Sequence, residues 1–139
     1  ISRRPRGTPI DRSVAELMIL ANSTWAGELH AAGQPALYRV QSGGKVRTST
    51  AAGPHDGLGV TQYLWATSPL RRYADLVNQR QLIARVRGEA PVYAGRDSTL
   101  LTAMRDFEAA HEIYGEFQRG MERYWSLRWL QQEGPAAVS

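Results

Sequence analysis

The sequence predicts a mostly helical fold, with three main helices and one short strand or extended segment. Apolar residues recur at intervals of three and four near the N-terminus, again after Pro69, and once more toward the C-terminus. Glycine and proline interrupt these patterns, so each of them predicts a separate helix.

The first pattern predicts a helix over residues 11 to 32. We expect Asp11 or Ser13 to cap it, with Glu16 completing a capping box with Ser13, and Gly33 to end it. The apolar face of this helix is expected to contain Val14, Met18, Ala21, Trp25 and Leu29.

The short segment 36–41 follows the first helix and is partly alternating in polarity. Pro35 and the sequence Ser42-Gly43-Gly44 bound it, which favours a strand or an extended segment. Residues 42–59 carry five glycines and Pro54 and are predicted to form a loop.

The second helix is predicted to begin near Pro69 and to end before Gly88. The third carries a long apolar stripe, which is typical of a core or packing surface, and Gly115 and Gly120 are positions where it could bend. The stripe consists of Leu100, Met104, Phe107, Tyr114, Phe117, Met121, Trp125 and Trp129.

The length of 139 residues corresponds to about one domain. We expect a basic N-terminal segment or linker over 1–10, a folded part over 11–133 and a tail over 134–139. The chain begins at Ile1 rather than at methionine, which suggests an excerpt or a processed piece. It has no apolar run of the roughly 20 residues that a membrane span requires, no signal-peptide core and no cysteine. We therefore expect a soluble cytoplasmic protein.

The net charge of +4 is weak evidence for a nucleic-acid partner, because Arg3, Arg4 and Arg6 account for most of it. The choice of basic residue says more, since Lys45 is the only lysine and the planar fork of arginine suits phosphate oxygens. A GC-rich coding bias would give the same preference.

The segment 67–73, with the sequence TSPLRRY, is the strongest candidate for a binding site. Ser68, or Thr67 before it, can cap a helix whose first residue is Pro69. The free N–H groups of the first turn, together with Arg71 and Arg72, would then bind a phosphate. The alternative, in which one of these arginines pairs with a carboxylate such as that of Asp75, stays open.

Other candidate chemistry in the sequence is sparse. Tyr63 and Trp65, beside the predicted phosphate site, could stack on bases, although burial is the alternative. The sequence GLG at 57–59 lacks the third glycine of a dinucleotide-binding loop, and Asn22 fits a glycosylation sequon only nominally, inside a predicted helix. The histidines are far apart, and no group of Asp and Glu residues has the spacing of a metal site.

The sequence GLGVTQYLWATSPLRRYADLVNQRQL at 57–82 closely resembles the signature of the ribonuclease II and RNase R family of exoribonucleases, the RNB-domain family. In this chain Trp65-Ala66 replaces the usual aromatic run, Leu70 replaces isoleucine, and Gln79 stands where histidine usually precedes Arg80. The sequences VAELMILAN at 14–22, PALYRVQ at 35–41 and FQRGMERYWSLRWL at 117–130 also resemble family segments, in the expected order.

The resemblance implies that residues 11–133 are the C-terminal part of an α/β RNB catalytic domain. Members of the family hydrolyse single-stranded RNA from its 3′ end to nucleoside 5′-monophosphates. They use Mg²⁺ held by an aspartate cluster in the first part of the domain, and that cluster is not in this sequence. We therefore expect no metal ligands here, an inactive fragment, and the missing N-terminal part of the domain as a partner.

The resemblance also implies roles for individual residues. Arg71 would stabilise the charge that develops on the scissile phosphate, and Asp75 would hold a guanidinium in place. Glu122 and Arg123 would line the pocket for the 3′ end or brace Arg71. The RNA backbone would be positioned by Arg72, Ser68, Thr67 and Tyr63.

Two alternatives belong to other functional classes. The first is a non-catalytic RNA-binding relative that kept the arginines and lost the aspartates. The second is a helical interaction module in which the TSPLRRY turn merely caps a helix.

Overall fold

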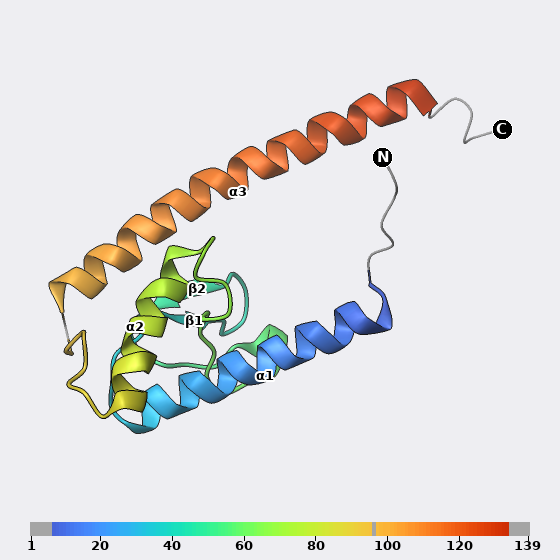
Figure 1. Ribbon diagram of the computed structural model, residues 1–139. Coiled ribbons are helices and arrows are strands. Elements are labelled where there is room, and N and C mark those ends of the chain that lie inside the picture. The colour runs from blue at the N-terminus through green and yellow to red at the C-terminus, as the bar shows by residue number, and fades with distance from the viewer. Residues whose placement is uncertain (1–6, 96, 134–139) are drawn as a thin grey trace. The chain divides into compact units, whose positions relative to one another are not determined.

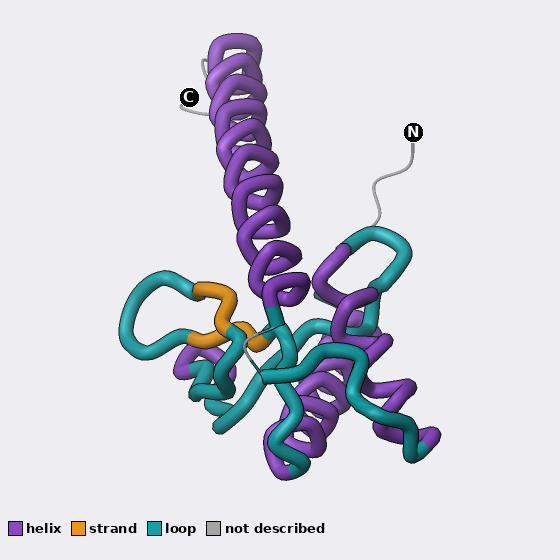
Figure 2. The backbone as a smooth tube through the Cα atoms, turned by 90° about the vertical axis from the view of Figure 1, so that its left-hand side faces the viewer, coloured by secondary structure: helices purple, strands orange, loops and turns teal. Residues whose placement is uncertain are grey.

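The computed structural model describes residues 7–95 and 97–133 of the chain. The predicted tail at 134–139 and most of the predicted basic segment at 1–10 lie outside the described residues. The elements, traced in Figures 1 and 2, are α1 (Pro9–Ala31), β1 (Tyr38–Val40), β2 (Arg47–Ser49), the 3-10 helix η1 (Asp56–Leu58), α2 (Tyr73–Arg87) and α3 (Ser98–Glu133). The expected three helices and short strand are confirmed, whereas the loop expected at 42–59 also contains β2 and η1.

The chain forms two compact units, the first extending to Arg105 and the second beginning at Asp106. The boundary lies within α3, whose early residues Leu100 and Ala103 are buried in the first unit. The phosphate-site candidates at 67–75 all belong to the first unit. None of the helices that the structure describes is long and apolar enough to cross a bilayer.

Helix α1 begins two residues earlier than the sequence predicts. The Oγ1 atom of Thr8 accepts a hydrogen bond from the Asp11 amide at 3.2 Å, and the Asp11 carboxylate accepts one from the Thr8 amide at 3.2 Å. This capping box, with Pro9 at the first helical position, replaces the expected caps at Asp11 and Ser13. The predicted end at Gly33 is confirmed, since Gly33 has a φ of 64° and follows the last turn.

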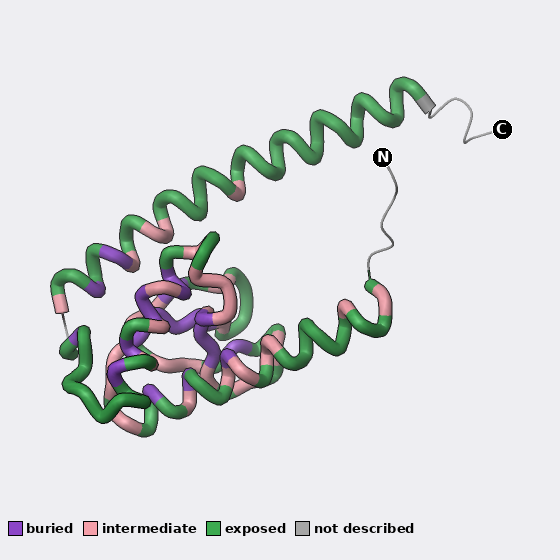
Figure 3. Tube along the Cα trace, in the orientation of Figure 1, coloured by how far each residue is buried: buried purple, intermediate pink, exposed green. Residues whose placement is uncertain are grey.

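The buried face of α1 differs from the predicted apolar stripe. Asn22, Ala26 and Leu29 are the buried residues of this helix, whereas Val14 is 50% exposed and Trp25 is 36% exposed. Figure 3 shows burial concentrated in the C-terminal part of α1. Only Leu29 of the predicted stripe is fully buried, and the polar Asn22 takes a place in the core because it has hydrogen-bond partners there.

Strand β1 lies between β2 and the segment that leads to the arginines. It pairs antiparallel with β2, with Arg39 opposite Thr48. On its other side the Arg39 amide donates to the Tyr63 carbonyl at 2.8 Å, and Tyr38 forms a bridge with Leu64. Segment 63–64 therefore extends the sheet at one edge and has a fixed place in the fold.

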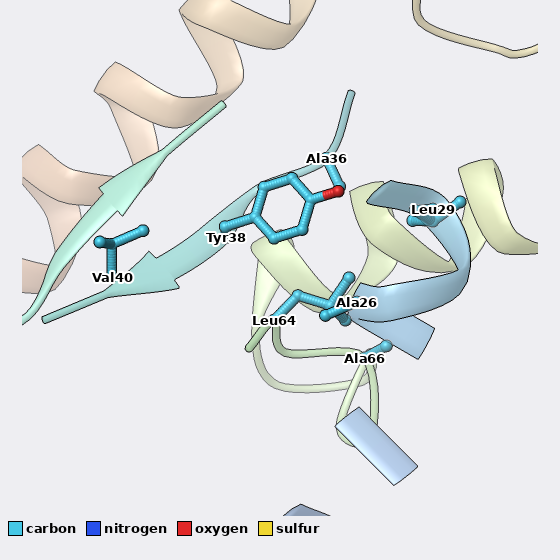
Figure 4. Packing of buried hydrophobic residues seen from close by; sticks show 7 residues of the cluster. All are labelled: Ala26, Leu29, Ala36, Tyr38, Val40, Leu64 and Ala66. Carbon is cyan, nitrogen blue, oxygen red and sulfur yellow. The ribbon is translucent and has the colours of Figure 1, made fainter. Parts of the chain in front are cut away.

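The core of the first unit joins α1, β1 and this same segment. Figure 4 shows the side chains that pack together, which are Ala26, Leu29, Ala36, Tyr38, Val40, Leu64 and Ala66. Burial raises the pKa of Tyr38 to about 12. Because Leu64 and Ala66 belong to this core, the residues that follow them start from a well-packed base.

The GLG sequence at 57–59 forms a turn and not a nucleotide-binding loop. Gly59 ends η1 with a φ of 65°, a conformation that glycine adopts without strain. The Gly57 amide donates to Gln41 Oε1 at 3.0 Å, and a Cβ atom at Gly57 would lie only 2.6 Å from that oxygen. Gly59 therefore allows the positive φ at the end of η1, and Gly57 allows the close approach of the Gln41 side chain.

Helix α3 is capped by Asp97, whose carboxylate accepts from the amides of Thr99 at 2.7 Å and Leu100 at 3.3 Å. The hydrogen bond from Thr99 lowers the pKa of Asp97. The helix continues without a break through Gly115 and Gly120. In the second unit its large apolar side chains are exposed, and they include Ile113, Tyr114, Phe117, Tyr124, Trp125 and Trp129.

Candidate functional site

The two arginines of the TSPLRRY segment lie in a turn before α2, not on its first helical turn. The amides of Arg71 and Arg72 both donate to the Ser68 carbonyl, at 3.2 and 3.1 Å, and close this turn. Arg72 is the N-cap, with extended backbone at φ −128° and ψ 117°, and its own side chain makes no capping hydrogen bond to the helix. The predicted helix start near Pro69, with Ser68 or Thr67 as cap, is therefore wrong.

Asp75 explains why the helix starts where it does. Its Oδ1 atom accepts a hydrogen bond from the Ser68 amide at 2.7 Å, across the turn. The carboxylate of the third helical residue thus holds the Ser68 backbone, so Ser68 lies outside the helix instead of capping it.

Asp75 also pairs with Arg72. The Arg72 NH2 atom lies 2.7 Å from Asp75 Oδ1, and the side chains are 16% and 0% exposed. Arg72 Nε and Asp75 Oδ2 are buried and have no hydrogen-bond partner within the described part of the chain. The sequence left open whether one of the two arginines pairs with Asp75, and the structure shows that Arg72 does so.

Arg71 is in a different environment from its neighbour. It is exposed, and its NH2 atom makes a long hydrogen bond of 3.4 Å to Ser68 Oγ. A guanidinium held so loosely keeps most of its five N–H donors available to an anion. Of the two adjacent arginines, Arg71 is the one whose charge faces solvent.

Trp65 contacts two guanidinium groups. The guanidinium carbon of Arg72 lies 4.2 Å from the centre of its ring, and that of Arg39 lies 4.5 Å from it. Arg39 also donates from NH1 to Thr48 Oγ1 at 2.8 Å, across the β1–β2 pair. Trp65 is one of the two aromatic residues that the sequence offers as a stacking platform for bases, whereas no sequence pattern pointed to Arg39.

Tyr63, the other aromatic candidate, is buried. Its hydroxyl accepts a hydrogen bond from Asn22 Nδ2 at 3.3 Å, and its ring meets the His55 ring edge-on at 5.5 Å between centroids. Asn22 also bonds to Thr67 Oγ1, at 3.4 Å. Tyr63 and Thr67 therefore contact the helix α1 side of the site through one asparagine.

The backbone of residues 65–68 is held by side chains from both helices. Asn22 Oδ1 accepts from the Ala66 amide at 3.1 Å, Asn78 Nδ2 donates to the Trp65 carbonyl at 2.9 Å, and Gln79 Nε2 donates to the Ala66 carbonyl at 2.7 Å. The sequence did not predict these roles for the side-chain amides of Asn22, Asn78 and Gln79. The available signal was an asparagine or glutamine on the inner face of a predicted helix, which needs a partner when buried.

Replacing Asn22 by alanine is expected to lower the free energy of unfolding by about 2 kcal/mol, because the Ala66 amide would be left buried without an acceptor. Urea denaturation of the chain measures this cost. Thr24→Ala is the matched control, since Thr24 is an exposed residue of the same helix. Equal stability of the two variants would contradict this role for Asn22.

Glu122 and Arg123 lie in the second unit, and both are exposed. Glu122 Oε1 accepts from Gln118 Nε2 at 2.9 Å on the same helix. The candidates that the structure brings together are those of the first unit, namely Tyr63, Thr67, Ser68, Arg71, Arg72 and Asp75. Within the residues described, no three His, Cys, Asp or Glu side chains are grouped so that they could hold a metal ion.

The RNB domain family matches residues 44–88, a range that contains the arginine turn and all of α2. Exoribonuclease 2 of Klebsiella pneumoniae (strain 342) is 37% identical over an alignment of 76 residues, which covers 50% of this chain and 12% of that protein. Over this segment the chain resembles the RNB-domain exoribonucleases. Exoribonuclease 2 of Salmonella paratyphi B is 46% identical over 57 residues. This alignment covers 41% of this chain and 9% of the Salmonella protein.

The structure also resembles a solved exoribonuclease. A crystal structure of an active-site mutant of the Dss1 exoribonuclease from Candida glabrata matches with a TM-score of 0.80 and 26% sequence identity. The match covers 89% of this chain and 20% of the Dss1 chain. The resemblance to the RNB family that the TSPLRRY segment carries is thus confirmed, and the chain spans a small part of its relatives' length.

Proposed function

We propose that the chain is the C-terminal part of the catalytic domain of a hydrolytic 3′-to-5′ exoribonuclease, which degrades single-stranded RNA to nucleoside 5′-monophosphates. The observation that carries this proposal is the exposed guanidinium of Arg71 on a turn whose backbone is held by the buried carboxylate of Asp75 at Ser68 and, just before the turn, by the half-buried amide of Gln79 at Ala66. A charge held in this way is suited to a phosphate that changes its charge during reaction.

The residues of the first unit would share the work as follows. Arg71 stabilises negative charge on the scissile phosphate. Arg72, braced by Asp75, contacts the RNA backbone through the part of its side chain that is exposed. Ser68 and Thr67 lie on the same turn and offer hydroxyl groups for hydrogen bonds to the backbone of the RNA.

Tyr63 would act as a support for this turn and not through direct contact, because it is buried. Glu122 and Arg123 are proposed to line the pocket for the 3′ end. Their exposed side chains are able to contact a ligand, and this role rests on the family resemblance alone.

The proposed enzyme would depend on Mg²⁺, which supplies Lewis-acid activation of water and of the phosphate in such hydrolases. The described residues do not fit this metal, because they contain no group of acidic or histidine side chains placed to bind it. Its ligands would be aspartates outside these residues. The contribution of this chain is therefore electrostatic and positional, and we expect it to be inactive alone.

The exposed apolar surface supports the missing part of the domain as a partner. Helix α1 exposes Ile10, Leu17 and Leu20, and the second unit exposes its aromatic residues. A groove of about 460 Å³ between α1 and α2 is lined by the apolar side chains of Trp25, Leu82, Ile83 and Val86 and by the polar residues Glu28, Gln79, Arg85 and Arg87. Apolar patches of this kind mark interfaces, and the matched Dss1 chain is far longer than this one. We infer that the remainder of an RNB domain covers these faces.

Binding of a fluorescently labelled single-stranded RNA to the 139-residue chain tests the proposal. We expect affinity to fall steeply with salt, because phosphate contacts release counterions. Arg71→Ala should weaken binding severalfold and reduce the slope of log affinity against log salt by about 0.7, the value for one phosphate of a single strand. Arg12→Ala removes an exposed arginine of α1 and should leave both unchanged.

The outcomes separate the functional classes. A helical interaction module would show no measurable affinity for the RNA, and Arg71→Ala would not change its binding. This result would overturn the proposal. A non-catalytic RNA-binding relative would show the same binding loss as the proposed enzyme. Those two are separated by the rate of hydrolysis in the longer protein.

A further inference from the structure

The contact between Trp65 and Arg72 constrains the orientation of the Arg72 guanidinium. The hydrogen bond from Arg72 to Asp75 does not set this orientation by itself. The guanidinium of Arg72 bonds to Asp75 Oδ1 through NH2, while Arg72 Nε and Asp75 Oδ2 have no hydrogen-bond partner among the residues that the structure describes. An arginine and a carboxylate commonly form two parallel bonds, which fix the plane of the guanidinium. A single bond fixes one atom and leaves that plane free to turn about it.

The ring of Trp65 supplies the missing constraint. With the Arg72 guanidinium carbon 4.2 Å from the ring centre, the face of the indole limits rotation of the guanidinium. We propose that Trp65 is a positioning residue, which sets the orientation of Arg72 so that its exposed edge meets the RNA backbone. This inference rests on the proposed function, since it concerns the same phosphate-binding turn.

The backbone position of Trp65 is fixed by its neighbours in the fold. Its carbonyl is bonded to Asn78 Nδ2 at 2.9 Å, and the preceding Leu64 is fully buried in the core. The guanidinium of Arg39, reaching from β1, also lies within 4.5 Å of the ring centre. The backbone at Trp65 is thus held by α2 and follows a core residue, and the indole contacts Arg39 of β1.

A simpler account is that Trp65 only fills space. The two accounts differ in what they require of a replacement side chain. Phenylalanine keeps an aromatic face for the guanidinium, whereas leucine keeps apolar volume without that face. If space filling were the whole role, the two replacements would have similar effects on RNA affinity.

The affinity of the 139-residue chain for labelled single-stranded RNA tests this directly. We expect Trp65→Leu to weaken binding roughly fivefold, equivalent to about 1 kcal/mol, and Trp65→Phe to restore it to within about twofold of the original chain. In an Arg72→Ala background, Trp65→Leu should cause no further loss, because the residue that it positions is gone. Equal losses with leucine and phenylalanine, or the same loss in both backgrounds, would overturn the inference.

A second measurement needs no RNA. The ring current of Trp65 should shift the Arg72 Nε–H proton resonance upfield from its random-coil position, and Trp65→Leu should return it toward that position. A resonance at the random-coil position in the unsubstituted chain would overturn the inference. Thermal unfolding of each variant shows whether the fold is kept.

Two further variants separate failure of this inference from failure of the proposed function. Trp25→Leu alters another tryptophan of the first unit, in the α1–α2 groove, and should leave RNA affinity unchanged. If Arg71→Ala has no effect on RNA binding, the proposed function fails, and the proton resonance alone decides whether Trp65 orients Arg72. If Arg71→Ala weakens binding and Trp65→Leu does not, only the role of Trp65 is wrong.

Discussion

If the proposed function holds, replacing Arg71 by alanine is expected to slow RNA hydrolysis roughly 10²- to 10³-fold in a protein that carries this segment within a complete RNB domain, which is the size of effect seen when one stabilising donor is removed from an active site. Arg71 is exposed, and within the described part of the chain its guanidinium makes one long bond, to Ser68 Oγ, so it is available to respond to charge on the phosphate. Single-turnover rates and dissociation constants, measured for the same RNA, give the two effects separately. The rate should fall far more than the affinity.

Two controls define the result for Arg71. Arg71→Lys keeps a positive charge but loses the planar fork, and should have an intermediate rate. Arg12→Ala, at an exposed position of α1, should have the original rate. If turnover by Arg71→Ala stays within about threefold of the original, a difference under roughly 1 kcal/mol, the catalytic role assigned to Arg71 is wrong. A loss of affinity in Arg71→Ala, together with no hydrolysis by the unsubstituted protein, would favour the non-catalytic RNA-binding relative.

Asp75→Ala is expected to lower the free energy of unfolding by about 3–5 kcal/mol, the cost of leaving one member of a buried ion pair without its partner. Asp75 is completely buried and accepts from Arg72 NH2 and from the Ser68 amide, both at 2.7 Å. The substitution would leave the Arg72 charge uncompensated and would release the turn that carries Arg71. Urea denaturation of the 139-residue chain measures the loss.

A paired variant distinguishes the ion pair from the packing of Asp75. The double substitution Arg72→Met with Asp75→Leu removes both charges and keeps apolar volume, and should recover much of the stability lost in Asp75→Ala. Leu76→Ala, a neighbouring half-buried position of α2, shows what a packing change alone costs. A cost below about 1 kcal/mol for Asp75→Ala would show that the pair contributes little.

The sequence identified the helices because their apolar periodicity and end signals are local properties. Gly33 and Gly88 both adopt positive φ just past a helix, as glycine at that position commonly does. It did not identify the buried face of α1, because hydrophobicity favoured Val14 and Trp25 over Asn22. The asparagine is buried since the Ala66 amide, 44 residues away, needs an acceptor, and such a partner cannot be found from local spacing.

The sequence identified the residues of the candidate site but not which arginine pairs with Asp75. The sequence placed Arg71 and Arg72 beside an acidic residue, and Asp75 lies at helical spacing from both, three residues from one and four from the other. Which arginine pairs therefore depends on where the helix begins. Because α2 begins at Tyr73, the side chain of Arg72 reaches Asp75 and that of Arg71 faces solvent. Trp65 and Arg39 come together only through the sheet.

The hydrogen bonds to the backbone of residues 65–68 have a consequence for the thermodynamics of binding. Trp65, Ala66 and Ser68 lie outside any helix or strand, yet their backbone groups are held by side chains of α1 and α2. A loop that orders only when its ligand arrives loses conformational entropy at that moment, and its affinity is reduced accordingly. This turn is ordered in advance by folding, so a few contacts from Arg71 and its neighbours can produce useful affinity.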